Sequence, residues 1–250
     1  MSLTTVRQSM QATVWSSSLQ GIDGLPVEVE VDLGYGPSRF SIVGLAAAAV
    51  KESKDRVRSA LKGLVNRDAA LVDRVLVGDT PINQLHIEID SRCFKLLALH
   101  QPMAVDLRAI VAAVKINTDL ERVGDLAINI AEAVRRYMRH PPVKELIDIP
   151  RMADIAQRML RNALDAYVRR DTDLAQGVLN EDDTLDALKT QVFRELLTYM
   201  LQDPHTIEPS LDLILVSRHL ERIGDHATNV AEDVIFMVSA RDVRHHASEL

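Results

Sequence analysis

Apolar and charged residues alternate at a period of two near the start of the chain. Residues 27–33 read Val-Glu-Val-Glu-Val-Asp-Leu, and residues 39–43 continue in the same style after a Gly-Tyr-Gly-Pro turn. This period is typical of a strand that buries one face. The pattern predicts a hairpin across the turn and, with the segment before it, a small β cap. We place the strands of this cap at 12–20, 26–33 and 38–44.

From Ala46 onward the apolar residues return every three or four positions, the spacing of one face of a helix. This pattern continues through the rest of the chain. It is interrupted at Gln101-Pro102, Pro141-Pro142, Arg170-Asp171 and Asp203-Pro204, where such residues are expected to end a helix. We predict helices at 47–66, 68–100, 103–139, 149–170, 172–202 and 205–239.

The helical part of the sequence is an internal repeat. Residues 120–134 (LERVGDLAINIAEAV) and 220–234 (LERIGDHATNVAEDV) share ten identities in fifteen positions. A weaker match, at a shift of 103, pairs residues 65–85 with 168–188. The repeat predicts a mainly α fold of two tandem three-helix bundles that carries the small N-terminal β cap. The expected units are a β segment at 1–45, a first bundle at 46–140 and a second bundle at 141–250.

Two features predict how the middle helix of each bundle begins. Asp68 and Asp171 are equivalent in the weaker match, and a short acceptor side chain can cap the free amides of a first helical turn. Pro81 lacks an amide proton and clashes with a preceding turn, so it must lie at a helix start or a kink.

The last helix of each bundle carries two acidic residues four positions apart, Glu121 and Asp125 or Glu221 and Asp225. Residues four apart lie on the same helix face. Folding each half at its turn, near residue 102 or between 203 and 204, sets further oxygen-bearing side chains of the preceding helix opposite them. The first cluster is then Asp79, Asn83, Glu121 and Asp125, and the second cluster is Asp182, Asp186, Glu221 and Asp225.

Hard oxygen donors without nearby thiol or imidazole suit magnesium, calcium, manganese or iron rather than zinc. The di-iron pattern of ferritin-like proteins is not met, because Gly124 and Gly224 stand where it requires histidine. A bound cation would offset the repulsion between the stacked carboxylates. The alternative is an acidic face that is solvated or paired with cations such as Arg122 and Arg222.

Composition narrows the class of protein. The 250 residues are 47% hydrophobic but only 4% aromatic, and 36 acidic residues exceed 29 basic ones, for a net charge of −7. This balance argues against a surface that neutralises nucleic-acid phosphates. The one cysteine, Cys93, cannot form an internal disulfide, the first ten residues lack a secretory signal, and no apolar run approaches a membrane span. We expect a cytoplasmic protein that binds no nucleic acid and reaches a membrane only through partners.

Three motifs give most of the chain a family likeness. Residues 100–108 read His-Gln-Pro-Met-Ala-Val-Asp-Leu-Arg, residues 242–246 read Asp-Val-Arg-His-His, and Leu-Glu-Arg-(Val/Ile)-Gly-Asp occurs twice. On these motifs the chain from about residue 65 to 246 resembles the PhoU family of phosphate-signalling proteins. The resemblance implies tandem three-helix bundles and a regulatory rather than catalytic role. It also implies metal clusters at the acidic motifs, with iron favoured and magnesium, manganese or calcium as alternatives.

Carried over by position, the implied ligands are Asp79, Glu121, Asp125, Asp182, Asp186, Glu221 and Asp225. Asn83 stands where the second cluster has Asp186, which predicts weaker metal binding at the first cluster. The resemblance further implies negative regulation of phosphate uptake, through contact with the ATPase subunit of the phosphate ABC transporter and with the membrane sensor histidine kinase. We expect a homodimer. Two alternatives stay open: a metal-dependent hydrolase, and a structural helical adaptor that binds no metal.

The first part of the chain has a different likeness. Residues 19–32, 41–45 and 49–61 are similar to the start of the magnesium-chelatase-like AAA+ ATPases of the ComM type. The phosphate-binding loop Gly-x-x-x-x-Gly-Lys-(Ser/Thr) occurs nowhere in the chain, so ATP hydrolysis by that route is excluded. In this interpretation residues 46–65 supply only half of the usual first helix. We expect the β cap to cover the apolar surface left by the missing half, on the first bundle or on a second subunit.

Overall fold

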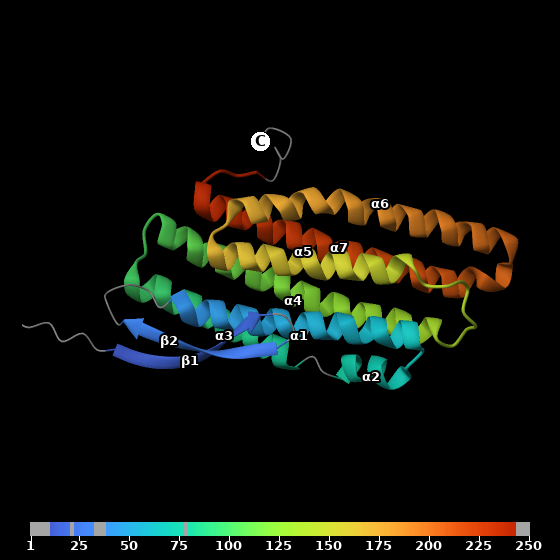
Figure 1. The fold of residues 1–250 in the computed structure, drawn as a ribbon, viewed down its shortest axis with the longest axis horizontal. Helices are drawn as coiled ribbons and strands as arrows, with labels where there is room; N and C mark the ends of the chain where they lie inside the picture. The colour runs from blue at the N-terminus through green and yellow to red at the C-terminus, as the bar shows by residue number, and fades with distance from the viewer. Residues whose placement is uncertain (1–10, 21–22, 33–38, 78–79, 244–250) are drawn as a thin grey trace, which may run out of the picture.

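The computed structural model describes residues 11–20, 23–32, 39–77 and 80–243, and the side chains of 51–77 and 84–243. Over these residues a β-hairpin is followed by helices (Figure 1). The strands are β1 (Gln11–Gln20) and β2 (Asp23–Asp32). The helices are α1 (Arg39–Asn66), α2 (Ala69–Val77), α3 (Thr80–His100), α4 (Val105–Tyr137), α5 (Asp148–Arg169), α6 (Thr172–Gln202), the short 3₁₀ helix η1 (Pro204–Thr206) and α7 (Ile207–Ser239).

The long helices form two antiparallel three-helix bundles in tandem, as the internal repeat predicts. The first bundle holds α1, α3 and α4 with the short α2 beside it, and the second holds α5, α6 and α7. Figure 1 shows α4 and α7 in the middle of the molecule, with α6 on one side and α2 and α3 on the other. The most extensive contact between helices is that of α4 with α7, so the last helix of each bundle forms the junction between them.

The N-terminal part differs from the prediction in two ways. The hairpin pairs β1 with β2, with Gln11 opposite Asp32 and Gln20 opposite Asp23, so the expected hairpin between 27–33 and 39–43 is wrong. Residues 39–44 are the first turns of α1, not a strand. A short apolar run is compatible with either structure, and here it leads directly into the alanine-rich segment that follows, which favours a helix.

The corrected start of α1 removes the reason for a half-length first helix. At 28 residues α1 is longer than its counterpart α5, which has 22. The strands of the hairpin make their main backbone contacts with each other, and extensive packing of the cap on the first bundle is not seen among the described elements. Packing of the cap on a second subunit stays a prediction.

The starts of the middle helices follow the local chemistry. The predicted helix 68–100 is divided into α2 and α3, and Pro81 is the second residue of α3, a position that needs no amide proton. Both N-caps are confirmed. The Asp68 carboxylate accepts hydrogen bonds from the amides of Ala70 and Leu71, and that of Asp171 accepts from the amide of Leu174 at 2.9 Å.

One hydrophobic core runs through both bundles. Most of its members are aliphatic residues, alanines and methionines of α1, α2, α4, α5, α6 and α7, joined by Tyr137 at the end of α4. The fully buried ones include Leu64, Leu120, Met159, Leu185 and Leu220. A smaller cluster of Ile89, Cys93, Ile110 and Ala113 joins α3 to α4. No helix in the described part of the chain is long and apolar enough to cross a membrane.

Candidate functional site

The second cluster is assembled where α6 and α7 approach each other closely at Gly224. A Cβ added to this glycine would lie 2.5 Å from Cδ2 of the buried Leu185 and 3.5 Å from Oδ1 of Asp182. The absence of a side chain therefore lets α7 lie directly against α6. The glycine stands between Glu221 and Asp225 in sequence, so the close approach brings both carboxylates to the level of Asp182.

Neighbouring carboxylates raise the pKa values of two aspartates in this cluster. Burial raises the pKa of the Asp182 carboxyl, and the negative charges of Asp225, Asp186, Asp183 and Glu221 raise it further, to about 6. The pKa of Asp225 is also raised, by burial first and then by Glu221 and Asp186. Such shifts arise when like charges share a poorly solvated site. The antiparallel alignment predicted from the turn between 203 and 204 is therefore supported.

A lysine lies across part of the second cluster. The Nζ atom of Lys189 is 2.8 Å from Oδ1 of Asp186 and 2.6 Å from Oε1 of Glu221, and it donates a hydrogen bond to each. These two bonds raise the pKa of the Lys189 ammonium above its usual value, so it stays charged. The repeat and the turn geometry did not point to this residue. Its signal was its charge and its spacing, three positions after Asp186 on the same helix.

An open groove runs beside the second cluster. Its volume is about 730 Å³, and its lining includes Lys189, Phe193, Glu221, Arg222 and Asp225. The groove gives solvent and small ions access to the carboxylates. The cluster is thus a set of hard oxygen donors at the protein surface, with one tethered cation among them.

The donor chemistry of the second cluster fits a hard metal cation, because its four carboxylates carry like negative charges that a positive ion would offset. Their present arrangement is not that of a finished metal site. No group of three or more Asp, Glu, His or Cys side chains in the described residues is placed to hold an ion. The assignment of Asp182, Asp186, Glu221 and Asp225 as ligands therefore stays a prediction.

The first cluster is described only in part. Asp79 and the side chain of Asn83 lie outside the described residues. Glu121 and Asp125 are partly exposed on α4, and Nη1 of Arg122 lies 3.6 Å from Oδ2 of Asp125. An ion pair of this exposure contributes little to stability. The predicted ligand set of the first cluster stays a prediction.

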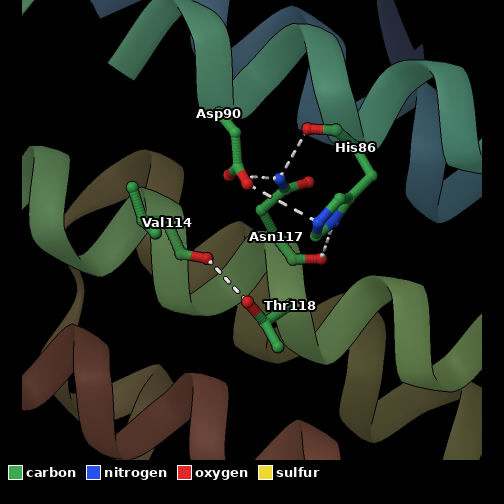
Figure 2. A network of polar contacts seen from close by, with 5 residues as sticks. All are labelled: His86, Asp90, Val114, Asn117 and Thr118. Atoms are coloured by element: carbon green, nitrogen blue, oxygen red, sulfur yellow. Dashed lines mark hydrogen bonds and ion pairs between the residues drawn. The ribbon is translucent and has the colours of Figure 1, made fainter. Parts of the chain in front are cut away.

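A polar network one turn from the first cluster fixes the alignment of α3 and α4. Figure 2 shows Asn117, which is buried, donating to the backbone oxygen of His86 and to Oδ1 of Asp90, both at 2.9 Å. The Nδ1 atom of His86 lies 3.3 Å from the Asn117 carbonyl oxygen. That oxygen can only accept, so Nδ1 carries the proton. His86 and Asn117 are almost equally far along the chain from Pro102, as an antiparallel pair turning there requires.

A second polar contact lies between the two bundles. Oδ1 of Asp119 on α4 is 2.8 Å from Nδ1 of His226 and 3.2 Å from Nδ2 of Asn229 on α7, and it accepts a hydrogen bond from each. His226 follows Asp225 directly, and its charge when protonated lowers the pKa of Asp225. This contact joins the second cluster to the junction between the bundles. Asp119 and its partners are more than one hundred positions apart in the sequence, so no local sequence pattern could predict this contact.

Comparison with known proteins covers the helical part of the chain. The PhoU domain family matches residues 49–134 and again residues 149–234. A protein of Caulobacter vibrioides named phosphate-specific transport system accessory protein PhoU homolog is 40% identical over 199 residues, 79% of this chain and 86% of its own length. The homolog of the same name from Pseudomonas putida is 41% identical over 191 residues, 76% of this chain and 75% of its length.

Two solved structures share the fold. The crystal structure of PhoU from Pseudomonas aeruginosa superposes with a TM-score of 0.77 at 36% identity, over 81% of this chain and 97% of that one. The phosphate transport system regulatory protein PhoU from Streptococcus pneumoniae superposes with a TM-score of 0.71 at 24% identity, over 82% and 94%, which supports the fold alone. The family match begins at residue 49, so the likeness of the first segment to the chelatase-like ATPases stays a prediction.

Proposed function

Because this chain belongs to the PhoU family, we propose that it is an accessory regulator of phosphate transport that binds metal cations at its two acidic clusters and acts by protein contact. The names of its relatives support the role in phosphate transport. The proposal assigns no catalytic step to the chain. Its location is the cytoplasm, and its partners are the ATPase subunit of the phosphate ABC transporter and the membrane sensor histidine kinase. It acts as a homodimer and lowers phosphate uptake.

The observation that carries the metal part of the proposal is the crowding of carboxylates in the second cluster. The pKa of Asp182 is raised to about 6 by burial and by neighbouring carboxylates, a cost that a structural helix pair has no need to retain. Asp182 and Asp186 on α6, with Glu221 and Asp225 on α7, would hold the cation. When bound, it supplies positive charge that offsets the repulsion and links α6 to α7. The first cluster would use Asp79, Asn83, Glu121 and Asp125, and iron is the favoured metal.

Elemental analysis tests this proposal on protein purified without chelator. The double variant Glu221→Ala, Asp225→Ala is expected to lose the metal of the second cluster while keeping that of the first. Glu208→Ala is the matched control, because Glu208 is an exposed carboxylate in the first turn of the same helix. The control is expected to keep the full metal content.

Two results would contradict the proposal. An unchanged metal content in the double variant would remove the ligand assignment. Protein that carries no metal in any form would favour the structural adaptor. The contact part is tested separately, by measuring whether the chain binds the purified transporter ATPase, and absence of binding would overturn that part.

A further inference from the structure

Lys189 is placed to neutralise the second cluster from within the chain. Its ammonium bridges a residue of its own helix, Asp186, and a residue of the facing helix, Glu221. The Glu221 side chain is only 16% exposed, whereas that of Asp186 is 52% exposed. Water therefore screens Asp186 well but Glu221 poorly, and Lys189 supplies the positive charge that the poorly solvated carboxylate lacks.

The two clusters balance their charge in different ways. The 103-residue shift places His86 where the second repeat has Lys189, and Asn83 where it has Asp186. His86 is engaged with Asn117 and Asp90 (Figure 2). The first cluster has three carboxylates, and the cation beside it is Arg122, which forms only an exposed ion pair with Asp125. The second cluster has one carboxylate more, and Lys189 stands beside it at the position that His86 holds in the first repeat.

Lys189 has room to leave its present position. It lines the groove beside Glu221 and a neighbouring groove along α6 that is also lined by Thr190, Gln191 and Arg194. A lysine ammonium sits on a flexible four-carbon stem and is strongly hydrated, so it can turn into solvent without disturbing the core. Asp186 and Glu221 would then each present a free carboxylate to the cluster.

We infer that Lys189 is the built-in counter-ion of the second cluster: its ammonium occupies Asp186 and Glu221 in the metal-free protein and must leave them before both can bind a metal cation. The inference rests on the proposed metal binding. It makes the second cluster stable without metal and weakens its affinity for metal. The charge advantage that Asp186 would give this cluster over the first is then cancelled.

The test is a titration with Mn²⁺, in which electron paramagnetic resonance reports the free ion. All proteins carry Glu121→Gln and Asp125→Asn, which silence the first cluster, and this doubly substituted protein is the parent. Lys189→Met removes the ammonium but keeps most of the stem. In the parent the Lys189 ammonium competes with the metal for both carboxylates through two partly exposed ion pairs. Each pair is weak, so the loss of both is expected to lower the dissociation constant for Mn²⁺ by only about tenfold. Lys189→Arg keeps the charge and is expected to bind Mn²⁺ no more tightly than the parent.

Lys144→Met is the matched control. Lys144 forms an ion pair with Glu195, a carboxylate of the same groove along α6 that does not belong to the second cluster. Its loss is expected to leave the Mn²⁺ affinity unchanged. Thermal unfolding in EDTA gives a second measurement: Lys189→Met is expected to unfold at a lower temperature than its parent, and to gain more from added Mn²⁺.

The outcomes separate the inference from the function on which it rests. If the parent and Lys189→Met bind Mn²⁺ equally well, Lys189 does not compete for the ligands, and the inference is wrong while metal binding stands. If neither binds Mn²⁺, the metal part of the proposed function fails and the inference falls with it. Tighter binding by Lys189→Met and by Lys144→Met alike would also overturn the inference, since it would show a general effect of removing a positive charge.

Discussion

At the scale of single residues, Asp182 shows how the second cluster lowers the stability of the metal-free fold. Its pKa of about 6 lies above the usual value for aspartate, near 3.9. Between these values the folded state binds more protons than the unfolded state, so stability falls as the pH rises through this window. Above it the charged carboxylate destabilises the metal-free fold. An aspartate that destabilises the metal-free fold is better explained as a metal ligand than as a residue needed for packing.

Replacing Asp182 with Asn tests this cost. In EDTA at about pH 7.5 the variant is expected to unfold at a temperature about 2–4 °C higher, since relief worth about 1 kcal/mol shifts the midpoint by that amount in a chain of this size. The gain is expected to shrink at about pH 5, where Asp182 of the parent protein is mostly protonated. Calorimetry at both pH values measures it. Asp154→Asn, an exposed carboxylate of α5, is the control and should change little.

The outcome that would contradict this prediction is a variant that is less stable than the parent at both pH values. Asp182 would then contribute a favourable contact rather than a repulsive charge. The same variant is expected to bind Mn²⁺ more weakly than the parent. The combination of higher metal-free stability and lower metal affinity is the result expected of a ligand.

At the scale of helices, one glycine sets the distance between α6 and α7. Gly224 is buried in the middle of α7, a position where glycine makes a helix less stable than alanine would. Its place is explained by Leu185, whose Cδ2 atom occupies the space that a side chain would need. The repeat contains glycine at the equivalent position, Gly124. The second cluster therefore depends on a close helix contact as well as on its carboxylates.

Gly224→Ala is expected to destabilise the protein by about 1–3 kcal/mol, because the new methyl group overpacks the contact with Leu185. Gly177→Ala is the matched control within α6, where an added Cβ meets no atom within 4 Å. The control is expected to stabilise the protein by about 0.5–1 kcal/mol through its better helix propensity. Urea unfolding measures both. Equal stability of the two variants would show that the contact at Gly224 is not tight.

At the scale of the whole molecule, the two bundles are joined between α4 and α7, where ion pairs lie beside the shared hydrophobic core. The Nζ atom of Lys115 lies 2.7 Å from Oδ1 of Asp233. The Nε atom of Arg136 lies 2.8 Å from Oδ1 of Asp212, whose side chain is 7% exposed. The 100-residue shift relates Arg136 to Phe236 and Asp212 to Ala112. The repeat-related positions are thus charged in one half of the junction and apolar in the other.

Arg136→Met is expected to cost about 3 kcal/mol, because it leaves the buried carboxylate of Asp212 without its partner. The double variant Arg136→Phe, Asp212→Ala copies the residues at the repeat-related positions and is expected to recover most of this loss. Urea unfolding measures both variants. Arg158→Met is the control, since its half-exposed pair with Glu181 lies within one bundle and should contribute under about 1 kcal/mol. A loss no larger than that of the control would show that the pair does not stabilise the junction.

Sequence alone predicts the helical repeat, its four breaks, both aspartate caps and the antiparallel alignment of α6 with α7. These follow from local rules: apolar spacing defines a helix face, short polar side chains cap a first turn, and a tight turn aligns the two helices it joins. The start of α1 was not determined, because the apolar run at 40–43 suits a strand as well as a helix.

Which charges meet across helices depends on the three-dimensional packing. Lys189 reaches Glu221 on the facing helix, and Asp119 reaches His226 and Asn229 in the other bundle. A helix period says which residues share a face, but not which of several long side chains will turn toward a given carboxylate. That choice depends on the distance between helices, which Gly224 sets, and on how well water reaches each charge.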